Sequence, residues 1–559
     1  MSKRLREDDT FDLPSAKRNR DLVTGPVDRL SSLSDELLLN ILSFLPVSSL
    51  NVCQTLSHRF HTLSGDSELW KRQYYSQWVR PRARRLANVR RSTLPAKTEY
   101  SPKVSTWLDH SHLAEEGKVT NWKRQYRLRH NWSRGLCRVT EVEFPQPTSP
   151  PSLVKLCAGN VFTADAPHGL RAWAARDPAS CLANIPFSDE REDSTVLPTA
   201  LAVNQQQDQQ EIVVGFENGR FNRYVFDVQT SRLILHSSHV GLSDGAITAM
   251  ALSSPYLLIV SQHKTLSLYN LRGQSHRPEA ANDITQPREL VSLKAENMIA
   301  PMTLSLRVSA LEIVATIVYS FFHIGCGWSQ GMQELRFDRD GQQLDCRIAS
   351  TVDSQYGMRP LQGLSPSLKR RHSASFEPTD IEGSTPAVPS ILHQQQPTSM
   401  SYSHPYLLTS HADNTLTMYI VVSDLSSLFV RGGQRLWGHT SSVSTVQVTN
   451  RGKAVSVSTR GDEIRIWELE AAVPSLGSRR PLKAENSIQV SPENKRRMES
   501  GSGRVPKSIQ QDAGGLGTVP SAPQEISRMH ECVGFDEERV LLLREKQVGT
   551  QLLECYDFT

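Results

Sequence analysis

The residues of this sequence that could carry out chemistry do not stand at the spacings a catalytic site requires. Its eight cysteines are scattered singly and form no C-x-x-C pair, so neither a zinc site nor a disulfide framework is expected. No glycine-rich phosphate loop, G-x-S-x-G segment or H-E-x-x-H helix occurs. We therefore expect no catalytic residue, no metal and no cofactor, and we expect Cys555 to be a buried strand residue.

One segment has the pattern of a phosphorylation site. In "KRRHSAS", Arg370 and Arg371 precede Ser373 at a spacing that basophilic kinases accept. A phosphate there would add about −2 charges to its loop. The alternative is a serine-rich loop that nothing modifies. Ser373 is thus a candidate phosphosite.

Basic residues gather in two other places. Lys3–Arg4 and Lys17–Arg20, with twelve residues between them, resemble a bipartite nuclear import signal in a tail (1–25) that we expect to be disordered. Lys71–Arg91 holds eight Lys or Arg and no Asp or Glu, which favours a solvated linker helix over a contact with an acidic partner. A formal net charge of +5 is mild, so nucleic acid is not the expected partner. No apolar leader segment is present, which indicates the nucleus, the cytoplasm or both.

These scattered groups must be positioned by folded elements, and the first of them is an apolar helical segment. Ser34 stands at an N-cap position, and Asp35 and Glu36 suit the positive end of a helix dipole. Aliphatic residues follow at i, i+1, i+4, i+5 and i+8: Leu37, Leu38, Ile41, Leu42 and Leu45. Pro46 ends this helix.

Two more short helices are predicted after it. Ser48 or Ser49 would cap the second and Ser67 would open the third, which carries Leu69 and Trp70. The positions expected to face inward on the second are Leu50, Val52, Leu56, Phe60 and Leu63. Three short helices cannot bury all the aliphatic side chains of the first helix, and each is worth about 1.5–3 kcal/mol when buried. We therefore expect another surface to cover them.

After residue 137 the pattern changes to short strands separated by turn residues. The clearest unit runs from Leu436 to Glu470 and contains Gly438–His439 and Trp467. Weaker copies lie near 159–174, 215–227, 260–271, 330–338, 409–421 and 533–559, giving seven units. Such units cannot bury both faces alone, so a closed ring is predicted, in which "RVTEVEF" pairs with the last unit.

Three segments need separate interpretation. The apolar run Ala310–Trp328 is long enough for a membrane span, but its β-branched residues, Glu312 and terminal glycines favour two buried strands. The Ser-, Pro-, Gly- and Gln-rich segments at about 354–400 and 472–525 are predicted to be disordered insertions.

The N-terminal helical segment resembles the F-box. The matching elements, in family order, are Leu33, Asp35–Glu36, "ILSFLP" (Ile41–Pro46), Leu50, "LSHRF" and Leu69–Trp70. In that family the segment binds a Skp-family adaptor, which links to a cullin and a RING protein. The residues that the resemblance assigns to adaptor binding are Leu33, Asp35, Glu36, Leu37, Leu38, Ile41, Leu42, Leu45, Pro46, Leu50 and Trp70.

The strand units resemble WD-repeat propellers, in which a His, a Ser or Thr, an Asp and a Trp form a structural network within a blade. His439 and Trp467 match that pattern, and Asp413 stands six residues before Tyr419, which replaces Trp. Asp462 lies five rather than six residues before Trp467, where Gly461 takes the usual place. "NWSRG" (Asn131–Gly135) resembles the segment before the first blade in proteins that combine both motifs.

Together the resemblances imply a multi-domain chain: a tail (1–25), a small all-α F-box (26–78), a basic helical linker (79–136) and an all-β, WD-repeat-like propeller of seven blades (137–559). They imply a non-catalytic substrate receptor of an SCF-type ubiquitin ligase, whose propeller holds the protein substrate, phosphorylated or not. Arg220, Arg223, Arg307 and Arg465 are strand residues that could read a phosphate, although the sequence does not say which face the groove.

Three alternatives remain open at this point. The helices could dock on the propeller as ordinary core. The chain could hold the adaptor without a cullin and act by sequestering a partner. It could also bind nucleic acid through the basic linker, which predicts a steep salt dependence.

Overall fold

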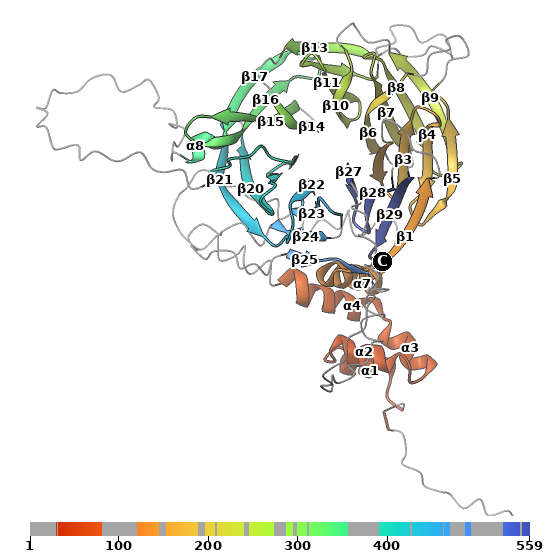
Figure 1. Ribbon diagram of the computed structural model, residues 1–559. Helices are drawn as coiled ribbons and strands as arrows, with labels where there is room; N and C mark the ends of the chain where they lie inside the picture. Colours follow the sequence, from red (N-terminus) through yellow and green to blue (C-terminus); the bar gives the residue numbers. More distant parts are fainter. Residues whose placement is uncertain are drawn as a thin grey trace, which may run out of the picture. The chain divides into compact units, whose positions relative to one another are not determined.

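A computed structural model describes the chain, and it divides into two compact units (Figure 1). The described residues are 29–30, 32–80, 120–144, 152–187, 196–206, 209–239, 245–272, 287–294, 299–309, 312–355, 391–424, 427–461, 463–469, 487–492, 529–547 and 550–559. The helical unit contains the described residues up to 80 and those from 120 to 126, and the propeller unit contains those from 127 to 559. The import-signal clusters, Ser373 and Asp462 lie outside the described residues.

Four α-helices and a π-helical turn form the first part of the helical unit. They are α1 (Asp35–Leu42), α2 (Val47–Cys53), α3 (His58–Ser64), α4 (Ser67–Tyr74) and η1 (Tyr75–Val79). The later helix α7 (Trp122–Arg134) contributes its residues up to Tyr126 to this unit.

The helix boundaries differ from the predicted ones because the second helix is broken. α2 begins at Val47 with Pro46 at its N-cap, so neither Ser48 nor Ser49 caps it. Ser57 opens α3, and its side chain accepts a hydrogen bond from Phe60 N at 3.2 Å. Asp66, not Ser67, caps α4 by accepting from Glu68 N at 2.9 Å. Ser34 is the N-cap of α1, but its side chain makes no capping hydrogen bond.

The strands of the propeller unit form seven sheets within the described residues. We number these sheets as blades I to VII. Blades I to III are β2 (Leu153–Cys157), β3 (Asn160–Asp165), β4 (Gly169–Ala174) and β5 (Asp177–Ile185); β6 (Pro198–Gln206), β7 (Gln209–Phe216), β8 (Phe221–Asp227) and β9 (Arg232–His239); and β10 (Ile247–Ser253), β11 (Tyr256–Ser261), β12 (Thr265–Asn270) and β13 (Arg288–Lys294).

The remaining blades follow the same antiparallel order. Blades IV to VI are β14 (Ile299–Val308), β15 (Ile313–His323), β16 (Gly327–Phe337) and β17 (Gln343–Ser350), followed by a short helix α8 (Thr351–Gln355); β18 (Ser399–Ser403), β19 (Tyr406–Ser410), β20 (Thr415–Ser423) and β21 (Leu428–Trp437); and β22 (Val443–Val448), β23 (Lys453–Ser458), β24 (Ile464–Glu468) and β25 (Ser487–Gln489). Blade VII is β27 (Met529–Phe535), β28 (Arg539–Gln547), β29 (Thr550–Asp557) and β1 (Leu136–Phe144), which also meets the two-residue β26 (Ser491–Pro492). Six of the seven predicted units each fall within one of these blades, and the unit Leu436–Glu470 begins at the end of β21 in blade V and covers β22 to β24 of blade VI.

The ring closes through strands from the two ends of the propeller. The first strand of every blade contacts the first strand of the next, and β27 contacts β2. β1 pairs with β29 in antiparallel register, from Arg138 opposite Asp557 to Phe144 opposite Gln551 (Figure 1). This confirms the predicted pairing of "RVTEVEF" with the last unit and leaves no gap between blades VII and I.

Apolar side chains on both faces of each sheet explain why the blades must stack. The seams between blades contain separate clusters, such as Leu258, Ile317 and Leu335 between blades III and IV. The apolar run at 310–328 forms β15 and the start of β16, as predicted, and its pairs begin with Ile313 opposite Phe337. Among the described residues, no helix is both long and apolar enough to cross a membrane.

The predicted insertions are shorter than the composition suggested, although most of each lies outside the described residues. Ser487–Gln489 forms β25, which pairs with β24 as the outer strand of blade VI, so the segment 472–525 is not insertion throughout. Ile391–His393 also belongs to the fold: His393 is buried and bridges to Gly327. Three-residue strands within Ser- and Pro-rich sequence carry too little periodicity to be recognised.

Candidate partner-binding surfaces

The helical unit has an apolar core of its own. Six buried side chains build it: Leu38, Leu42, Leu50, Phe60, Leu63 and Leu69. Leu33 and Leu45 are partly buried at its edge. Leu38, Leu42 and Leu50, which the resemblance assigns to adaptor binding, thus lie in the core of the unit itself, because α3 adds Phe60 and Leu63.

Outside this core, two apolar stripes are exposed to solvent. The first stripe lies on α1 and the turn after it, at positions i, i+4 and i+7. Its side chains are Leu37, Ile41 and Phe44, with exposed fractions of 53%, 42% and 74%. Val52 and Leu56, on α2 and the turn after it, are 61% and 62% exposed. We call these five residues the apolar stripes. Val52 was expected to face inward, but Leu50 takes the inward position, and two residues along a helix turn the side chain by about 200°.

Polar contacts hold the helices that carry the stripes. Arg59 of α3 donates to Asp35 Oδ1 at 2.6 Å and to Leu33 O at 2.6 Å, which ties the start of α1 to α3. The Arg72 guanidinium lies over the Phe44 ring at 5.6 Å, and Arg72 also donates to Ser43 Oγ at 2.9 Å. Asp35 is thus engaged within the unit, whereas Glu36 is exposed.

Trp70, which the resemblance assigns to adaptor binding, packs inside the helical unit. It is buried, its Nε1 donates to Ser64 O at 2.8 Å, and its ring meets the Tyr126 ring edge-on at 5.3 Å. Tyr126 and Trp122, which stand four residues apart at the start of α7, belong to the same aromatic cluster. The sequence prediction did not include these two residues, although their i, i+4 spacing is a helical signal.

In the propeller, the best-matching blade contains a buried polar network. Ser456 Oγ lies 2.6 Å from His439 Nε2 and accepts from Trp467 Nε1 at 2.7 Å. The acidic member is Glu463, whose Oε2 lies 3.4 Å from His439 Nδ1 and accepts from Thr440 N at 2.9 Å. The sequence prediction named neither Ser456 nor Glu463. It considered Asp462 for the acidic position, and Glu463 is the next residue along the chain.

The second predicted WD-repeat pair is not a pair. Asp413 accepts from Thr415 Oγ1 at 2.6 Å and lies 3.5 Å from Arg435, whereas Tyr419 is buried against Gly433. Burial raises the pKa of Tyr419 well above its usual range. Asp413 therefore shapes the turn before β20, and Tyr419 fills the core.

Two histidines stack beside that turn. The rings of His393 and His411 are 3.9 Å apart and nearly parallel, and His411 Nε2 lies 2.9 Å from Thr409 Oγ1. Burial lowers the pKa of His393 to about 4 and that of His411 to about 3, and the positive charge of Arg435 adds to both shifts. Both rings are therefore neutral near pH 7.

The four arginines that could have read a phosphate are all bound within the propeller. Arg223 pairs with Glu211, and Arg307 lies 3.0 Å from Glu334. Arg465 pairs with Glu463 at 2.6 Å, and Arg220 donates to Ser238 Oγ at 2.9 Å. Arg223, Arg307 and Arg465 are thus paired with carboxylates, whereas the hydroxyl group that accepts from Arg220 is neutral.

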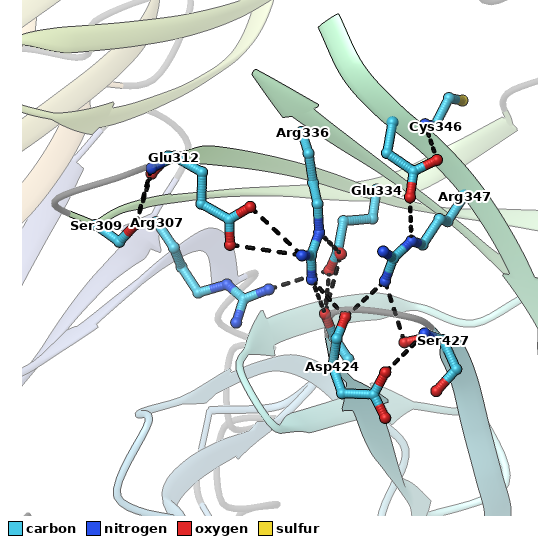
Figure 2. Close-up of polar contacts among 11 residues, drawn as sticks. Arg307, Ser309, Glu312, Glu334, Arg336, Cys346, Arg347, Asp424 and Ser427 are labelled. Atoms are coloured by element: carbon cyan, nitrogen blue, oxygen red, sulfur yellow. Dashed lines mark hydrogen bonds and ion pairs between the residues drawn. The ribbon is translucent and has the colours of Figure 1, made fainter. Parts of the chain in front are cut away.

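The densest of these networks joins blades IV and V (Figure 2). The buried Glu334 carboxylate accepts from Arg307 Nη2 at 3.0 Å, Arg336 Nε at 3.1 Å and Ser423 Oγ at 2.8 Å. Arg336 and Arg347 donate to the Asp424 carbonyl oxygen at 2.7 and 2.6 Å. The network ties β14 and β16 to the turn after β20, so its role is to hold the seam together.

Cys555 is buried in β29, as predicted, and burial raises its pKa to about 11, so the thiol stays protonated. Within the described ranges, no three His, Cys, Asp or Glu side chains come together in a way that could hold a metal ion.

A small helical unit with outward apolar stripes, followed by a seven-bladed propeller, defines an F-box protein with a β-propeller. The family model described as "F-box-like" matches residues 30–76, and the model described as "F-box protein pof12 beta-propeller" matches residues 137–559. The second match covers more than half of the chain. The chain therefore belongs to the F-box protein pof12 beta-propeller family.

Individual relatives agree with this assignment. The chain is 21% identical over 460 residues to "F-box protein pof12" of Schizosaccharomyces pombe, covering 78% of this chain and 84% of the relative. It is 45% identical over 47 residues to "F-box protein dre-1" of Caenorhabditis elegans, a match that spans 8% of this chain and 5% of that protein. Among solved structures, the WD40 β-propeller domain of Doa1 is 9% identical, covering 75% of this chain and 95% of that one, with a TM-score of 0.33.

Proposed function

We propose that this protein is the non-catalytic substrate receptor of an SCF-type ubiquitin ligase. In this proposal the apolar stripes bind a Skp-family adaptor, through which the cullin and the RING protein are recruited. The propeller binds the protein to be ubiquitinated. The rate gain comes from holding substrate near the ubiquitin-conjugating enzyme and not from chemistry by this chain. We expect it to act in the nucleus, the cytoplasm or both.

The observation that carries the proposal is the exposure of five large apolar side chains on a unit whose core is already complete. Single exposed aliphatics are ordinary, but stripes at helical spacing on two neighbouring segments are typical of a protein interface. Because Leu38, Leu42 and Leu50 are covered by the unit itself, Leu37, Ile41, Phe44, Val52 and Leu56 can be covered only by another surface.

Affinity capture of the full chain tests the proposal. Wild-type protein should recover both the adaptor and the cullin from cells of its own organism. The double variant Leu37→Asp, Phe44→Asp should recover neither, because each carboxylate would have to be buried in an apolar interface. The matched control is Ile348→Asp, which changes an equally exposed aliphatic residue on the outer strand of blade IV and should recover both.

Two other outcomes of the affinity capture would count against the proposal. Equal recovery by wild type and the double variant would contradict the proposal. Recovery of the adaptor without the cullin, with no protein accumulating after deletion of residues 27–75, would favour the alternative in which the chain sequesters a partner.

A further inference from the structure

The turn between β15 and β16 of blade IV carries exposed apolar residues. Ile324, at its tip, is 96% exposed, and Phe322 is 58% exposed. The corresponding turns of blades II, III and V are polar: Glu217–Arg220, Gln262–Lys264 and His411–Asn414. The tip is held in shape because His323 Nδ1 accepts from the backbone N–H groups of Gly325 and Cys326, both at 3.2 Å.

Two further exposed apolar residues are joined to this turn by contacts. Phe322 meets the Trp328 ring edge-on at 5.9 Å, and Trp328 N donates to His393 O at 2.8 Å. Leu392 therefore lies beside the turn, and its carbonyl accepts from Arg435 Nη2 at 3.2 Å. The Arg435 guanidinium in turn lies over the Trp437 ring at 6.0 Å.

We call these four exposed residues the blade IV–V patch: Phe322, Ile324, Leu392 and Trp437. β15, the second strand of blade IV, and β21, the fourth strand of blade V, both end at this patch. Because the strands of a blade are antiparallel, its second and fourth strands run in the same direction and end on the same face of the ring. The patch therefore lies on the face of the ring that carries the turns between second and third strands. It is separate from the Glu334 network, which lies where β14 and β16 end (Figure 2).

The charges beside the patch balance one another. Arg435 lies 3.5 Å from the Asp413 carboxylate, and these two residues are the charged pair next to Trp437. His393 and His411, behind the patch, are neutral near pH 7 because burial lowers the pKa of each. The following residues, Gln394–Gln396, are uncharged. A ligand that fits this surface needs apolar side chains and no net charge.

We propose that the blade IV–V patch binds an unphosphorylated, uncharged segment of another protein that is rich in aliphatic and aromatic side chains. This inference rests on the proposed function, and it names the substrate chemistry for the propeller. Charge matching supports it: three of the four propeller arginines considered for phosphate are neutralised by Glu211, Glu334 and Glu463, whereas the patch is apolar and its neighbouring pair Arg435–Asp413 is balanced in charge.

Binding of synthetic peptides to the full-length protein tests this inference. Three matched sets of 15-residue peptides would be compared by fluorescence anisotropy: one apolar and uncharged, one with two aspartates added, and one with a phosphoserine added. The apolar set should bind best. Ile324→Asp and Trp437→Asp should each weaken that binding about tenfold or more, because a large apolar contact is replaced by a charge.

Ile348→Asp is the matched control, since Ile348 is 70% exposed but lies on the outer strand β17, where it is opposite Gln333 and not in the turn that carries Ile324. It should bind the apolar set as wild type does. A preference for the phosphorylated or acidic set, no binding of any set, or equal binding by wild type and Ile324→Asp would overturn the inference.

The adaptor provides a separate readout. Ile324→Asp and Trp437→Asp should bind purified adaptor as wild type does, since both residues lie in the propeller. Loss of peptide binding with adaptor binding retained supports the inference. Failure of the wild type to bind the adaptor would instead contradict the proposed function and leave the peptide result to stand alone.

Discussion

The helical unit and the propeller treat apolar and charged side chains in opposite ways. The leucine-rich core of the helical unit contains six buried apolar residues, while the five residues of the apolar stripes are exposed to solvent. Among the described residues, the long-range ion pair of this unit, Arg59–Asp35, is also exposed. The propeller buries apolar side chains in every seam and places ion pairs inside them, as at Glu334.

The difference explains why charge is a poor guide to the partners of this protein. An ion pair inside a seam neutralises its arginine and fixes two blades relative to each other, so Arg307 and Arg336 are engaged within the propeller. The stripes of the helical unit and the blade IV–V patch have no such internal partners. The five experiments below test this contrast, beginning with the largest expected effect.

Breaking the IV–V seam should have the largest effect on stability. Glu334→Ala leaves the partly buried Arg307 and the buried Arg336 without their shared carboxylate, which should lower the free energy of unfolding by about 3–5 kcal/mol. Urea unfolding followed by tryptophan fluorescence measures this. Arg451→Ala, which removes the more exposed pair with Glu537, should cost less than about 1 kcal/mol. Equal costs for the two variants would refute the contrast between buried and exposed pairs.

Neighbouring leucines on α1 should respond in opposite ways. Leu38→Ala opens a cavity in the core and should destabilise the helical unit by about 2–5 kcal/mol. Leu37→Ala changes an exposed side chain and should alter stability by less than about 0.5 kcal/mol, yet it should weaken adaptor binding. Urea titration and adaptor binding, measured on both variants, would separate the two roles. A destabilised Leu37→Ala would show that the stripe is part of the core.

Acid should destabilise the propeller through its stacked histidines. Their folded-state pKa values, about 4 for His393 and about 3 for His411, lie below the 6.5 of an unfolded histidine. As the pH falls below 6.5, the unfolded chain therefore takes up protons first, and stability present above pH 6.5 is lost on the way to pH 4. Each histidine should contribute a loss of about 3 kcal/mol by pH 4, and His411→Gln should remove the share of His411.

The control for the pH experiment is His263→Gln, which changes an exposed histidine in the turn after β11. Its pH profile should follow that of the wild type. If His411→Gln had the same acid dependence as the wild type, other groups would be responsible for it.

The network in blade VI should give a smaller effect. Ser456→Ala removes the hydroxyl that accepts from Trp467 Nε1 and faces His439, which leaves buried polar groups without a partner and should cost about 1–3 kcal/mol. Combining it with Trp467→Phe in a double-mutant cycle should give less than the sum of the two single effects. Strict additivity would show that the two side chains do not act together.

The smallest effect is expected at the tip of blade IV. Ile324→Ala should change the free energy of unfolding by less than about 0.5 kcal/mol, because the side chain has almost no internal contacts to lose. Thermal unfolding of the full chain measures this. A clear destabilisation would mean that the tip packs within the propeller and is not available to a partner.

The sequence was sufficient to predict the architecture. The Gly-His and Trp positions of blade VI, together with alternation in six weaker units, predicted seven blades and the pairing of β1 with β29. β25 was missed because three strand residues in Ser-rich sequence carry no measurable alternation. Within blade VI, the acidic position was sought at Asp462 and is filled by Glu463, a shift that only the three-dimensional path of the turn reveals.

The sequence predicted which segment carries the apolar side chains of the candidate site, but not which of those side chains face outward. The apolar segment at Leu33–Phe60 was correctly recognised as helical, but its periodicity was carried through the turn at Gln54–Ser57, which put Val52 and Leu56 inside. Trp70 was assigned to adaptor binding by the resemblance to the F-box, and its contact with Tyr126 was not predicted because the two residues are distant in the sequence. The blade IV–V patch could not be predicted, since Ile324 and Leu392 look like ordinary core residues until their exposure is known.

Titration of the full-length protein with purified Skp-family adaptor, followed by calorimetry, tests the central claim most directly. The claim is that the apolar stripes of the helical unit are a binding surface. Wild type and Ile348→Asp should bind with the same affinity, and Leu37→Asp combined with Phe44→Asp should bind at least a hundredfold more weakly. Equal affinity for all three proteins would contradict the claim.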